Sequence, residues 1–410
     1  MKYYKHSQLV KEYNVSDRTV RNWVEASLQG KVDLKLFEQK GRYYVADSVA
    51  NQSVLEGLAE QGKKYRNSRS TKSVDVSPQF YRTFTPFQQR DIINGLEKER
   101  ELSWHYSYFG GAADYWNDYL MELHSAGKGN LITNTIDTIK LNFSYLESLI
   151  EQYDHVNLIN ICTGNNIAIH DLVSRIKASG KLRRLIGVDI SGDMLDIAEK
   201  NIERWFGDSV SMERRVQDIR NQPIDISEND GVVDAPNTLN IFLMVAGPLK
   251  NFRQPSRVLK TINQSMGKDD LLITTTKRDT PETRAFFDFN VKGDSDPLDH
   301  SGFLARLLNI DKSFYDVVLG HDEEKRYKSI TLKVNLSINF QEGNSHHTVS
   351  MEKGESILIW KADQFSDEKL VELLNTSGFD CLLTSQSLDQ QLLLTLSRPK
   401  FAPWSGKHEE

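Results

Sequence analysis

Hydrophobic runs alternate with amphipathic segments from about residue 155 onward. Strand-like runs occur at 156–161, 185–188, 210–216, 239–246 and 271–275, and helical patterns occur at 167–178, 193–205 and 251–266. This alternation predicts an α/β fold with a parallel sheet that carries helices on both faces. In open sheets of this kind, ligands bind at the carboxyl ends of the strands, where the strand order reverses.

The pattern changes between about residues 281 and 353. Apolar residues occupy every second position from Ile330 to Phe340, which predicts one half-buried antiparallel strand with a return strand at 347–351. We expect this stretch to be an inserted α+β lobe that closes over a ligand. A helix at 366–375, capped by Ser366, and strands at 381–384 and 392–396 then return to the sheet.

The first 62 residues predict a small separate domain. Ser7 is a candidate cap for a short first helix, Asn14 offers a turn, and Ser16 can cap a second helix with an apolar stripe at Val20, Trp23 and Val24. Residues 34–45 then read as a hairpin that turns at Lys40–Gly41. Residues 47–65 can form one more helix, and 63–86 have the composition of a linker. The predicted domains are therefore 1–62, then 87–280 with 354–410, and the lobe at 281–353.

Composition limits the classes of protein to consider. The chain has 410 residues, of which 39% are hydrophobic and 26% charged, as in a globular protein of two or three domains. Cys162 and Cys381 are the only cysteines, too few for a disulfide framework or a four-thiolate zinc site, so we expect a cytoplasmic protein without a metal. No apolar run reaches the roughly 20 residues of a membrane span, and no secretory signal is visible. The sequence does not indicate an oligomeric state.

Charge is distributed unevenly along the chain. Residues 1–75 hold 14 Lys and Arg against 9 Asp and Glu, whereas the remainder holds 37 against 48. A basic N-terminal domain suits the phosphate backbone of a nucleic acid, and an acidic body would repel it. The candidate DNA-binding residues are the donors of the second helix and the hairpin tip: Arg18, Thr19, Arg21, Asn22, Lys40 and Arg42.

The segment from Val15 to Trp23, with the hairpin that follows, resembles the MerR and excisionase type of winged helix-turn-helix over about 50 residues. That resemblance implies DNA binding, although some modules of this type dock proteins instead, and both alternatives stay open. The long coiled-coil dimerisation helix of full MerR regulators has no counterpart in this chain.

The predicted strand ends carry a candidate nucleoside site. Gly164, in the turn after the first strand, lets the backbone approach a ligand, but G-x-G-x-x-G is absent, which disfavours a dinucleotide. Asp189 ends the second strand about 25 residues later and can accept both hydroxyls of a ribose. Asp218 and Ile219 follow the third strand and could bracket an adenine.

The segment from Ile186 to Leu195 resembles the second-strand motif of class I S-adenosylmethionine-dependent methyltransferases, which have a Rossmann-like sheet. Later segments resemble the histidine-specific methyltransferase family of ergothioneine biosynthesis across about residues 100–400; they are 245–252, 271–273, 314–321, 330–336 and 354–357. The resemblance implies S-adenosylmethionine as cofactor. It places Gly164, Asp189, Asp218 and Ile219 against the cofactor, with Tyr106 lying over it, and Asn251 against a small-molecule substrate.

Two departures from that family stand out. Its cofactor loop has an acid, a glycine and a later lysine where this chain has Asn160, Cys162 and Ala168, which bears on cofactor affinity. The family's acid and hydroxyl that hold the histidine imidazole, with the lysine that follows them, are replaced by Trp360, Ala362 and Gln364. A buried polar site without its partners rejects the original substrate, so histidine is disfavoured and Trp360 suits an apolar or aromatic ligand.

Two hypotheses follow from the sequence. In the first, the body is a methyltransferase for a small amine- or amino-acid-like molecule, and the N-terminal domain localises or regulates it. In the second, the chain is a MerR-like transcriptional regulator, and a degenerate methyltransferase fold serves as its ligand sensor.

Overall fold

A computed structural model describes residues 3–127, 129–226, 236–281, 302–321, 325–342 and 345–400. These residues form two compact units. The smaller comprises residues up to Ser73 with two short stretches, 334–337 and 350–353, and the larger comprises the rest from Val74 onward.

The larger unit is built around a seven-stranded sheet of order β15-β16-β9-β8-β5-β6-β7. Its strands are β5 (His155–Ile161), β6 (Leu182–Asp189), β7 (Met212–Val216), β8 (Thr238–Met244), β9 (Leu271–Lys277), β15 (Phe379–Gln386) and β16 (Leu392–Pro399). β16 pairs antiparallel with both its neighbours, and the other pairs are parallel. The predicted α/β sheet is confirmed, and its order reverses at β5, which pairs with both β6 and β8.

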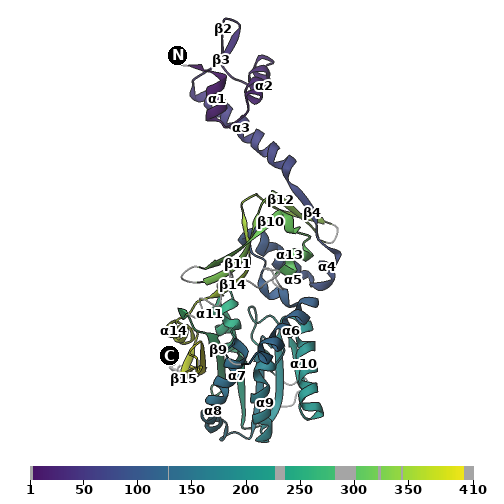
Figure 1. The fold of residues 1–410 in the computed structure, drawn as a ribbon, viewed down its shortest axis with the longest axis vertical. Coiled ribbons are helices and arrows are strands. Elements are labelled where there is room, and N and C mark those ends of the chain that lie inside the picture. The colour runs from purple at the N-terminus through teal and green to yellow at the C-terminus, as the bar shows by residue number, and fades with distance from the viewer. Residues whose placement is uncertain are drawn as a thin grey trace, which may run out of the picture. The chain divides into compact units, whose positions relative to one another are not determined.

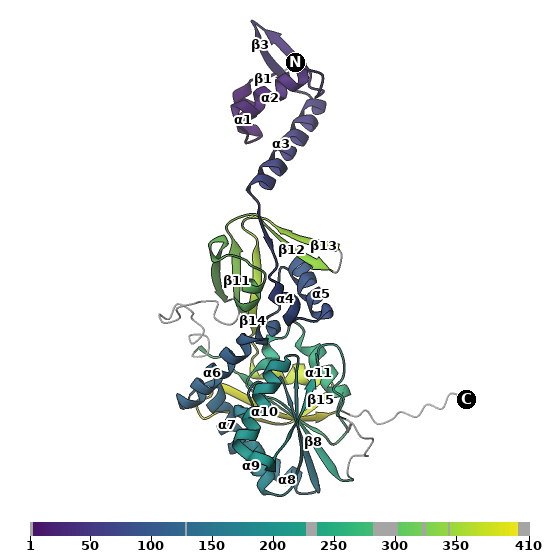
Figure 2. The same cartoon turned by 90° about the vertical axis from the view of Figure 1, so that its right-hand side faces the viewer.

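Helices cover both faces of this sheet (Figure 2). One face packs against α7 (Leu131–Leu141), α8 (Phe143–Ile150), α9 (His170–Ala178) and α10 (Gly192–Phe206), and the other against α11 (Pro255–Gln264) and α14 (Asp367–Thr376). Successive residues of β5 enter different cores: Leu158 packs on the first face and Ile159 on the second. This is why the strands read as continuous apolar runs.

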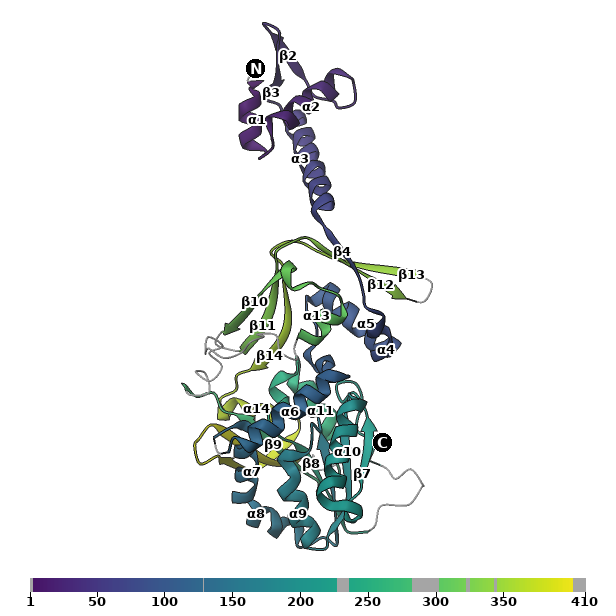
Figure 3. The ribbon, with the colours of Figure 1, turned by 45° about the vertical axis from the view of Figure 1, so that its right-hand side comes forward.

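The lobe contains β10 (Tyr315–His321), β11 (Lys325–Leu332) and β14 (Ser356–Asp363), which form an antiparallel sheet of order β10-β11-β14 (Figure 3). A second small sheet joins β13 (Ser345–Met351), β12 (Leu336–Glu342) and β4 (Lys72–Asp75). Further helices among the described residues of this unit include α4 (Pro78–Thr83), α5 (Pro86–Asn94), α6 (Gly111–Ser125) and α13 (Phe303–Leu307), with short turns η2 (Trp104–Tyr108) and η5 (Pro248–Asn251).

Two predictions for the lobe were wrong. The single strand expected from Ile330 to Phe340 is two strands in different sheets, because the chain bends at residues 333–335 between β11 and β12. The bend keeps the alternation of buried residues in phase, so periodicity alone does not reveal it. The return to the large sheet also comes later than residue 354, because β14 pairs with β11 and extends to Asp363.

The smaller unit gathers α1 (His6–Glu12), α2 (Asp17–Leu28) and the strands β1 (Tyr3–Tyr4), β2 (Leu36–Gln39) and β3 (Arg42–Ala46) at the start of α3 (Val49–Ser70) (Figure 1). Ser16 caps α2 as expected, through its side chain and Thr19 N at 3.1 Å. Lys5, not Ser7, precedes the first helical residue of α1. Part of the stretch expected to be a linker forms regular structure, because α3 continues to Ser70 and β4 and α4 follow.

Candidate active site

A cavity of about 720 Å³ lies at the carboxyl ends of the parallel strands. Segments that follow β5, β6, β7, β8 and β9 line it, together with η2, α6 and residues of β11 and β14. The size suits a small ligand with a partner molecule, since such sites usually occupy roughly 300–1,000 Å³. The position is the one expected from the strand order.

Asp189 lies in this cavity at the end of β6. Its Oδ1 accepts a hydrogen bond from Ser191 N at 3.0 Å. Burial raises the pKa of Asp189 to about 6, although backbone N–H groups of Ser191, Gly164, Ile190 and Thr163 act against the shift. Burial destabilises the ionised form of this carboxylate. Additional hydroxyl donors, such as those of a ligand, would stabilise the ionised form and lower the pKa again.

The turn after β5 brings the backbone close to the cavity. Gly164 has φ +56°, and Cys162 has φ +55°, in the left-handed region where side chains with a Cβ are strained. Asn160 donates from Nδ2 to Thr163 O at 3.2 Å and to Asn166 Oδ1 at 2.8 Å, so it fixes the turn internally. Burial raises the pKa of the Cys162 thiol well above its usual range, with help from the charges of Asp189 and Asp218, so the sulfur is protonated.

Asp218 and Ile219 also line the cavity, and Ile219 is buried. Both carboxylate oxygens of Asp218 already have two donors each. Oδ1 accepts from Arg220 N and Nε at 3.0 and 2.8 Å, and Oδ2 accepts from Arg220 Nη2 and Asn221 Nδ2 at 2.6 and 2.8 Å. The side chain of Asp218 is therefore committed to shaping its own loop.

Tyr106 does not line the cavity, unlike the other predicted cofactor residues. Its side chain is fully buried, and its hydroxyl donates to Asp91 Oδ2 at 2.7 Å. Arg220 joins the same group, with Nη2 at 3.1 Å from Asp91 Oδ2. Burial and the charge of Asp91 raise the pKa of Tyr106 far above its usual value. Tyr106 thus connects α5 and η2 to the loop that carries Asp218.

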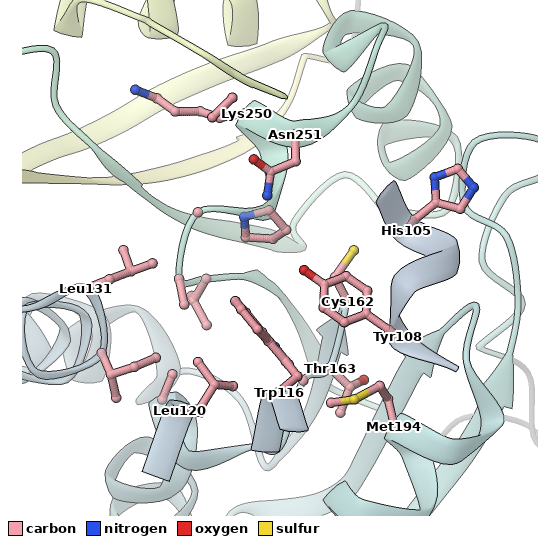
Figure 4. Close-up of a pocket in the computed structure, with 18 of the residues that line it drawn as sticks. His105, Tyr108, Trp116, Leu120, Leu131, Cys162, Thr163, Met194, Lys250 and Asn251 are labelled. Atoms are coloured by element: carbon pink, nitrogen blue, oxygen red, sulfur yellow. The ribbon is translucent and has the colours of Figure 1, made fainter. Parts of the chain in front are cut away.

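An aromatic wall that the sequence analysis did not identify lines the cavity beside the segment that carries Tyr106. Trp104 and Tyr108 pack edge to face with ring centroids 4.9 Å apart, and Trp116 follows at 5.3 Å from Tyr108. Figure 4 shows Tyr108 and Trp116 facing the middle of the cavity near Cys162. Trp104 Nε1 donates to Asn251 O at 3.0 Å and Ser191 Oγ donates to Tyr108 O at 2.5 Å, so the wall is fixed to two of the loops.

Both predicted substrate residues line the cavity. Asn251 ends η5, and α11 begins only at Pro255 after the cap residue Gln254, so Asn251 is not a helix cap. Its amide points inward in Figure 4 and has no hydrogen-bond partner within the described part of the chain. Trp360 lies on β14 directly opposite Lys328 of β11, and Ala362 lies opposite Arg326.

The candidate DNA-binding residues belong to the smaller unit, and none of them lines this cavity. Arg18, Arg21 and Asn22 are exposed on α2, and Lys40 and Arg42 are exposed at the β2–β3 turn. Thr19 is engaged at the start of α2, where its Oγ1 lies 2.8 Å from Ser16 Oγ. Arg21 forms an exposed ion pair with Asp17 at 2.7 Å.

The described residues include neither a membrane-spanning helix nor a cluster of metal ligands. None of their helices combines the length and apolarity needed to cross a bilayer. No three His, Cys, Asp or Glu side chains within the same ranges come together as candidate metal ligands.

The chain is similar to several solved structures, each at low identity. A S-adenosylmethionine-dependent methyltransferase from Clostridium acetobutylicum is 10% identical, with 77% of this chain and all of that chain covered and a TM-score of 0.33. Magnesium protoporphyrin IX methyltransferase from Synechocystis is 11% identical, with 70% and 98% covered and a TM-score of 0.37. The CcbJ methyltransferase from Streptomyces caelestis is 10% identical, with 66% and 97% covered and a TM-score of 0.34. No curated protein matches the chain.

A match to one protein family establishes the family of this chain. Residues 139–399 match the family described as histidine-specific methyltransferase, SAM-dependent, which spans more than half of the chain. The match covers β5 to β16 and hence the large sheet, the lobe and the strand-end loops that line the cavity. The chain therefore belongs to the histidine-specific, S-adenosylmethionine-dependent methyltransferase family, and S-adenosylmethionine is its cofactor.

Proposed function

We propose that this methyltransferase acts on a small amine- or amino-acid-like molecule other than histidine. One observation carries the proposal. In the family an acid and a hydroxyl hold the imidazole, and at those positions this chain places Trp360 and Ala362 on the cavity side of β14. An imidazole in that position would lose both polar partners, which costs about 1–3 kcal/mol for each buried group.

We further propose which residues hold the cofactor. The Asp189 carboxylate accepts the two ribose hydroxyls, the turn at Gly164 lets the chain backbone approach, and Ile219 packs against the adenine. Support comes from the cavity position of all three and from the raised pKa of Asp189, because hydroxyl donors would stabilise its ionised form. Asp218 acts indirectly by holding its loop through Arg220.

S-adenosylmethionine supplies an electrophilic methyl group on a sulfonium. The chain's own work is to align an unprotonated nucleophile with that methyl group and to keep water away. Trp104, Tyr108 and Trp116 suit the second task, since they line the cavity and the Trp104 ring and the Tyr108 backbone are held to the loops by hydrogen bonds. The Asn251 side-chain amide suits the alignment of the nucleophile, because it is a polar group in the cavity that can hydrogen-bond the methyl acceptor.

The test is methyl transfer by the full-length chain, measured as release of S-adenosylhomocysteine. Histidine is compared with phenylalanine, tryptophan and their decarboxylated amines. We expect turnover on an aromatic acceptor and none above background on histidine, and Asp189→Ala should weaken cofactor binding by about a hundredfold or more and reduce turnover with it. A kcat/KM for histidine above that of every other acceptor would refute the proposed substrate class.

The sequence also raised a ligand-sensor alternative, which the family match does not favour. DNA binding by the smaller unit remains a separate second candidate, and we propose it on the exposed basic residues of α2 and the β2–β3 turn. Together Arg18, Arg21, Asn22, Lys40 and Arg42 offer donors for phosphates and base edges.

That second candidate is tested by fluorescence anisotropy of the full-length chain on duplex DNA over a range of salt concentrations. Arg18→Ala and Arg42→Ala should each weaken binding and reduce the salt slope by about one. Lys11→Ala, an exposed residue on α1, is the matched control. If all three variants bind duplex DNA as wild type does, Arg18 and Arg42 do not bind DNA, and a protein partner becomes the better explanation for them.

A further inference from the structure

One buried serine links the aromatic wall to the loop that follows β6. Ser191 has no exposed surface, and its Oγ donates to Tyr108 O at 2.5 Å. Figure 4 shows Met194, three residues after Ser191, on the same side of the cavity as Tyr108. The two bonded residues are 83 positions apart in the sequence, so this contact ties the end of η2 to the start of α10.

The Ser191 hydroxyl has a second partner within α10. It caps that helix, because Oγ accepts from Met194 N at 3.2 Å. A hydroxyl has one proton to donate and two lone pairs that accept, so the cap leaves the proton for Tyr108 O. Alanine at this position would lose both bonds, whereas threonine would keep both.

The backbone of Ser191 contacts the end of the cavity proposed for the ribose. Ser191 N donates to Asp189 Oδ1 at 3.0 Å. One residue therefore holds the Asp189 carboxylate with its amide and the Tyr108 backbone with its hydroxyl. A shift of Ser191 would move a proposed cofactor ligand and part of the aromatic wall together.

A second bond ties the wall where it continues into α6. Gly110 N donates to Asp193 Oδ2 at 2.7 Å, and Gly110 has φ +57° and ψ −142°, a conformation that favours glycine. Space does not demand glycine there, because an added Cβ would meet only Phe303 Cζ at 3.9 Å. The helix that carries Trp116 thus begins where the wall is tied. Asp193 is exposed, so water weakens this bond relative to that of the buried Ser191.

We propose that Ser191, assisted by Asp193, is a positioning residue for methyl transfer, whose hydroxyl holds the aromatic wall beside the bound cofactor while its N–H orients Asp189. This inference rests on the proposed function, because it takes Asp189 as the ribose ligand and the wall as the barrier to water. It goes further by assigning the link between them to one side chain. A wall held in this way slows ligand release, so loss of the bond should act mainly on the dissociation rate constant.

The experiment measures S-adenosylhomocysteine binding to the full-length chain by calorimetry and stopped-flow fluorescence. Ser191→Ala should weaken affinity about fivefold or more through faster dissociation, with the binding stoichiometry unchanged. Ser191→Thr should stay within about twofold of wild type.

Ser366→Ala is the matched control, because it removes the same kind of helix cap, from Ser366 Oγ to Lys369 N at 3.2 Å, without a tie to the wall. It should lose about as much stability in thermal unfolding as Ser191→Ala and bind S-adenosylhomocysteine as wild type does. A variant pair at the exposed position serves if Ser191→Ala does not fold. Asp193→Asn keeps an acceptor for Gly110 N, and Asp193→Ala, which does not, should release the ligand faster.

The outcomes separate this inference from the proposed function. If Ser191→Ala binds and releases S-adenosylhomocysteine as Ser366→Ala does, Ser191 is only a helix cap and the inference is wrong. A loss of affinity that comes entirely from slower association contradicts it as well, and so do equal release rates in the two Asp193 variants. Failure of the proposed cofactor site is recognised differently, because Asp189→Ala would then bind S-adenosylhomocysteine as tightly as wild type.

Discussion

At the scale of single residues, Cys162 shows what the sequence could and could not predict. The sequence identified it as a departure from the family's glycine, without a structural consequence. In the structure the position has φ +55°, so the turn keeps a conformation that suits glycine although a side chain is present. The turn survives because Asn160, Thr163 and Asn166 hydrogen-bond within it. Backbone angles of this kind cannot be read from composition or periodicity.

Replacing Cys162 measures that strain. Because a Cβ is unfavourable in the left-handed region, Cys162→Gly should be more stable than Cys162→Ala by roughly 0.5–1 kcal/mol, after the entropy of glycine is included. Urea unfolding gives the difference. Ala168→Gly, in the turn that follows, is the control and should lose stability, since Ala168 is not in that region. A Cys162→Ala chain at least as stable as Cys162→Gly would contradict the account.

The raised pKa of Asp189 predicts how cofactor affinity depends on pH. Because its pKa in the folded chain is about 6 against an ordinary 3.8, the stability that this group contributes is complete below 3.8 and is lost as pH rises through 6. Ribose hydroxyls favour the ionised form, so binding should release a proton in this window. S-adenosylhomocysteine should bind about tenfold more weakly at pH 5 than at pH 7.

Calorimetry in buffers of different ionisation enthalpy at pH 5.5 detects this proton. Asp189→Asn is the control, and its weaker binding should not change between the two pH values. Proton release of equal size in wild type and Asp189→Asn would show that another group titrates.

At the scale of elements, the large sheet was predictable and the lobe was not. Every strand from β5 to β9 was predicted with boundaries within a few residues. The inner strands are buried on both faces and form apolar runs that helices separate clearly, whereas the edge strand β7 also carries exposed and charged residues. The cap at Ser366 was also predicted and is confirmed, with Ser366 Oγ accepting from Lys369 N at 3.2 Å. The bend between β11 and β12 was missed because the alternation of buried and exposed positions continues in the same register across it, so that the sequence of two strands looks like that of one. Pairing partners, which distinguish them, are not encoded locally.

The contacts of Tyr106 link two elements and predict an effect on cofactor binding at a distance. Tyr106→Phe removes the hydroxyl that donates to Asp91, and Arg220 then remains as the partner of Asp91. We therefore expect the free energy of unfolding to fall by about 1–2 kcal/mol. Because Arg220 also holds Asp218, affinity for S-adenosylhomocysteine should fall several-fold. Thermal unfolding and calorimetry give the two values.

Tyr145→Phe, an exposed tyrosine on α8, serves as control and should change neither quantity. If Tyr106→Phe lowers stability but leaves cofactor affinity as in wild type, the group Asp91, Tyr106 and Arg220 is structural only.

At the scale of the whole molecule, the cavity joins residues that the sequence keeps far apart. The strand-end residues Gly164, Asp189 and Ile219 were predicted as a set because parallel strands bring their ends to one edge. The aromatic wall was not, because Trp116 of α6 meets Trp104 and Tyr108 only through tertiary packing. Their residue types are common in any chain, and only their shared cavity makes them informative.

The central claim is that the Asp189 carboxylate binds the ribose of the cofactor at the end of β6. Its most direct test is the affinity of the full-length chain for S-adenosylhomocysteine at pH 7.5, measured by calorimetry for wild type, Asp189→Ala and the exposed control Asp208→Ala. We predict a loss of about a hundredfold or more for Asp189→Ala, as expected for two charge-assisted hydrogen bonds, and wild-type affinity for the control. An Asp189→Ala chain that folds and binds within about twofold of wild type would contradict the account.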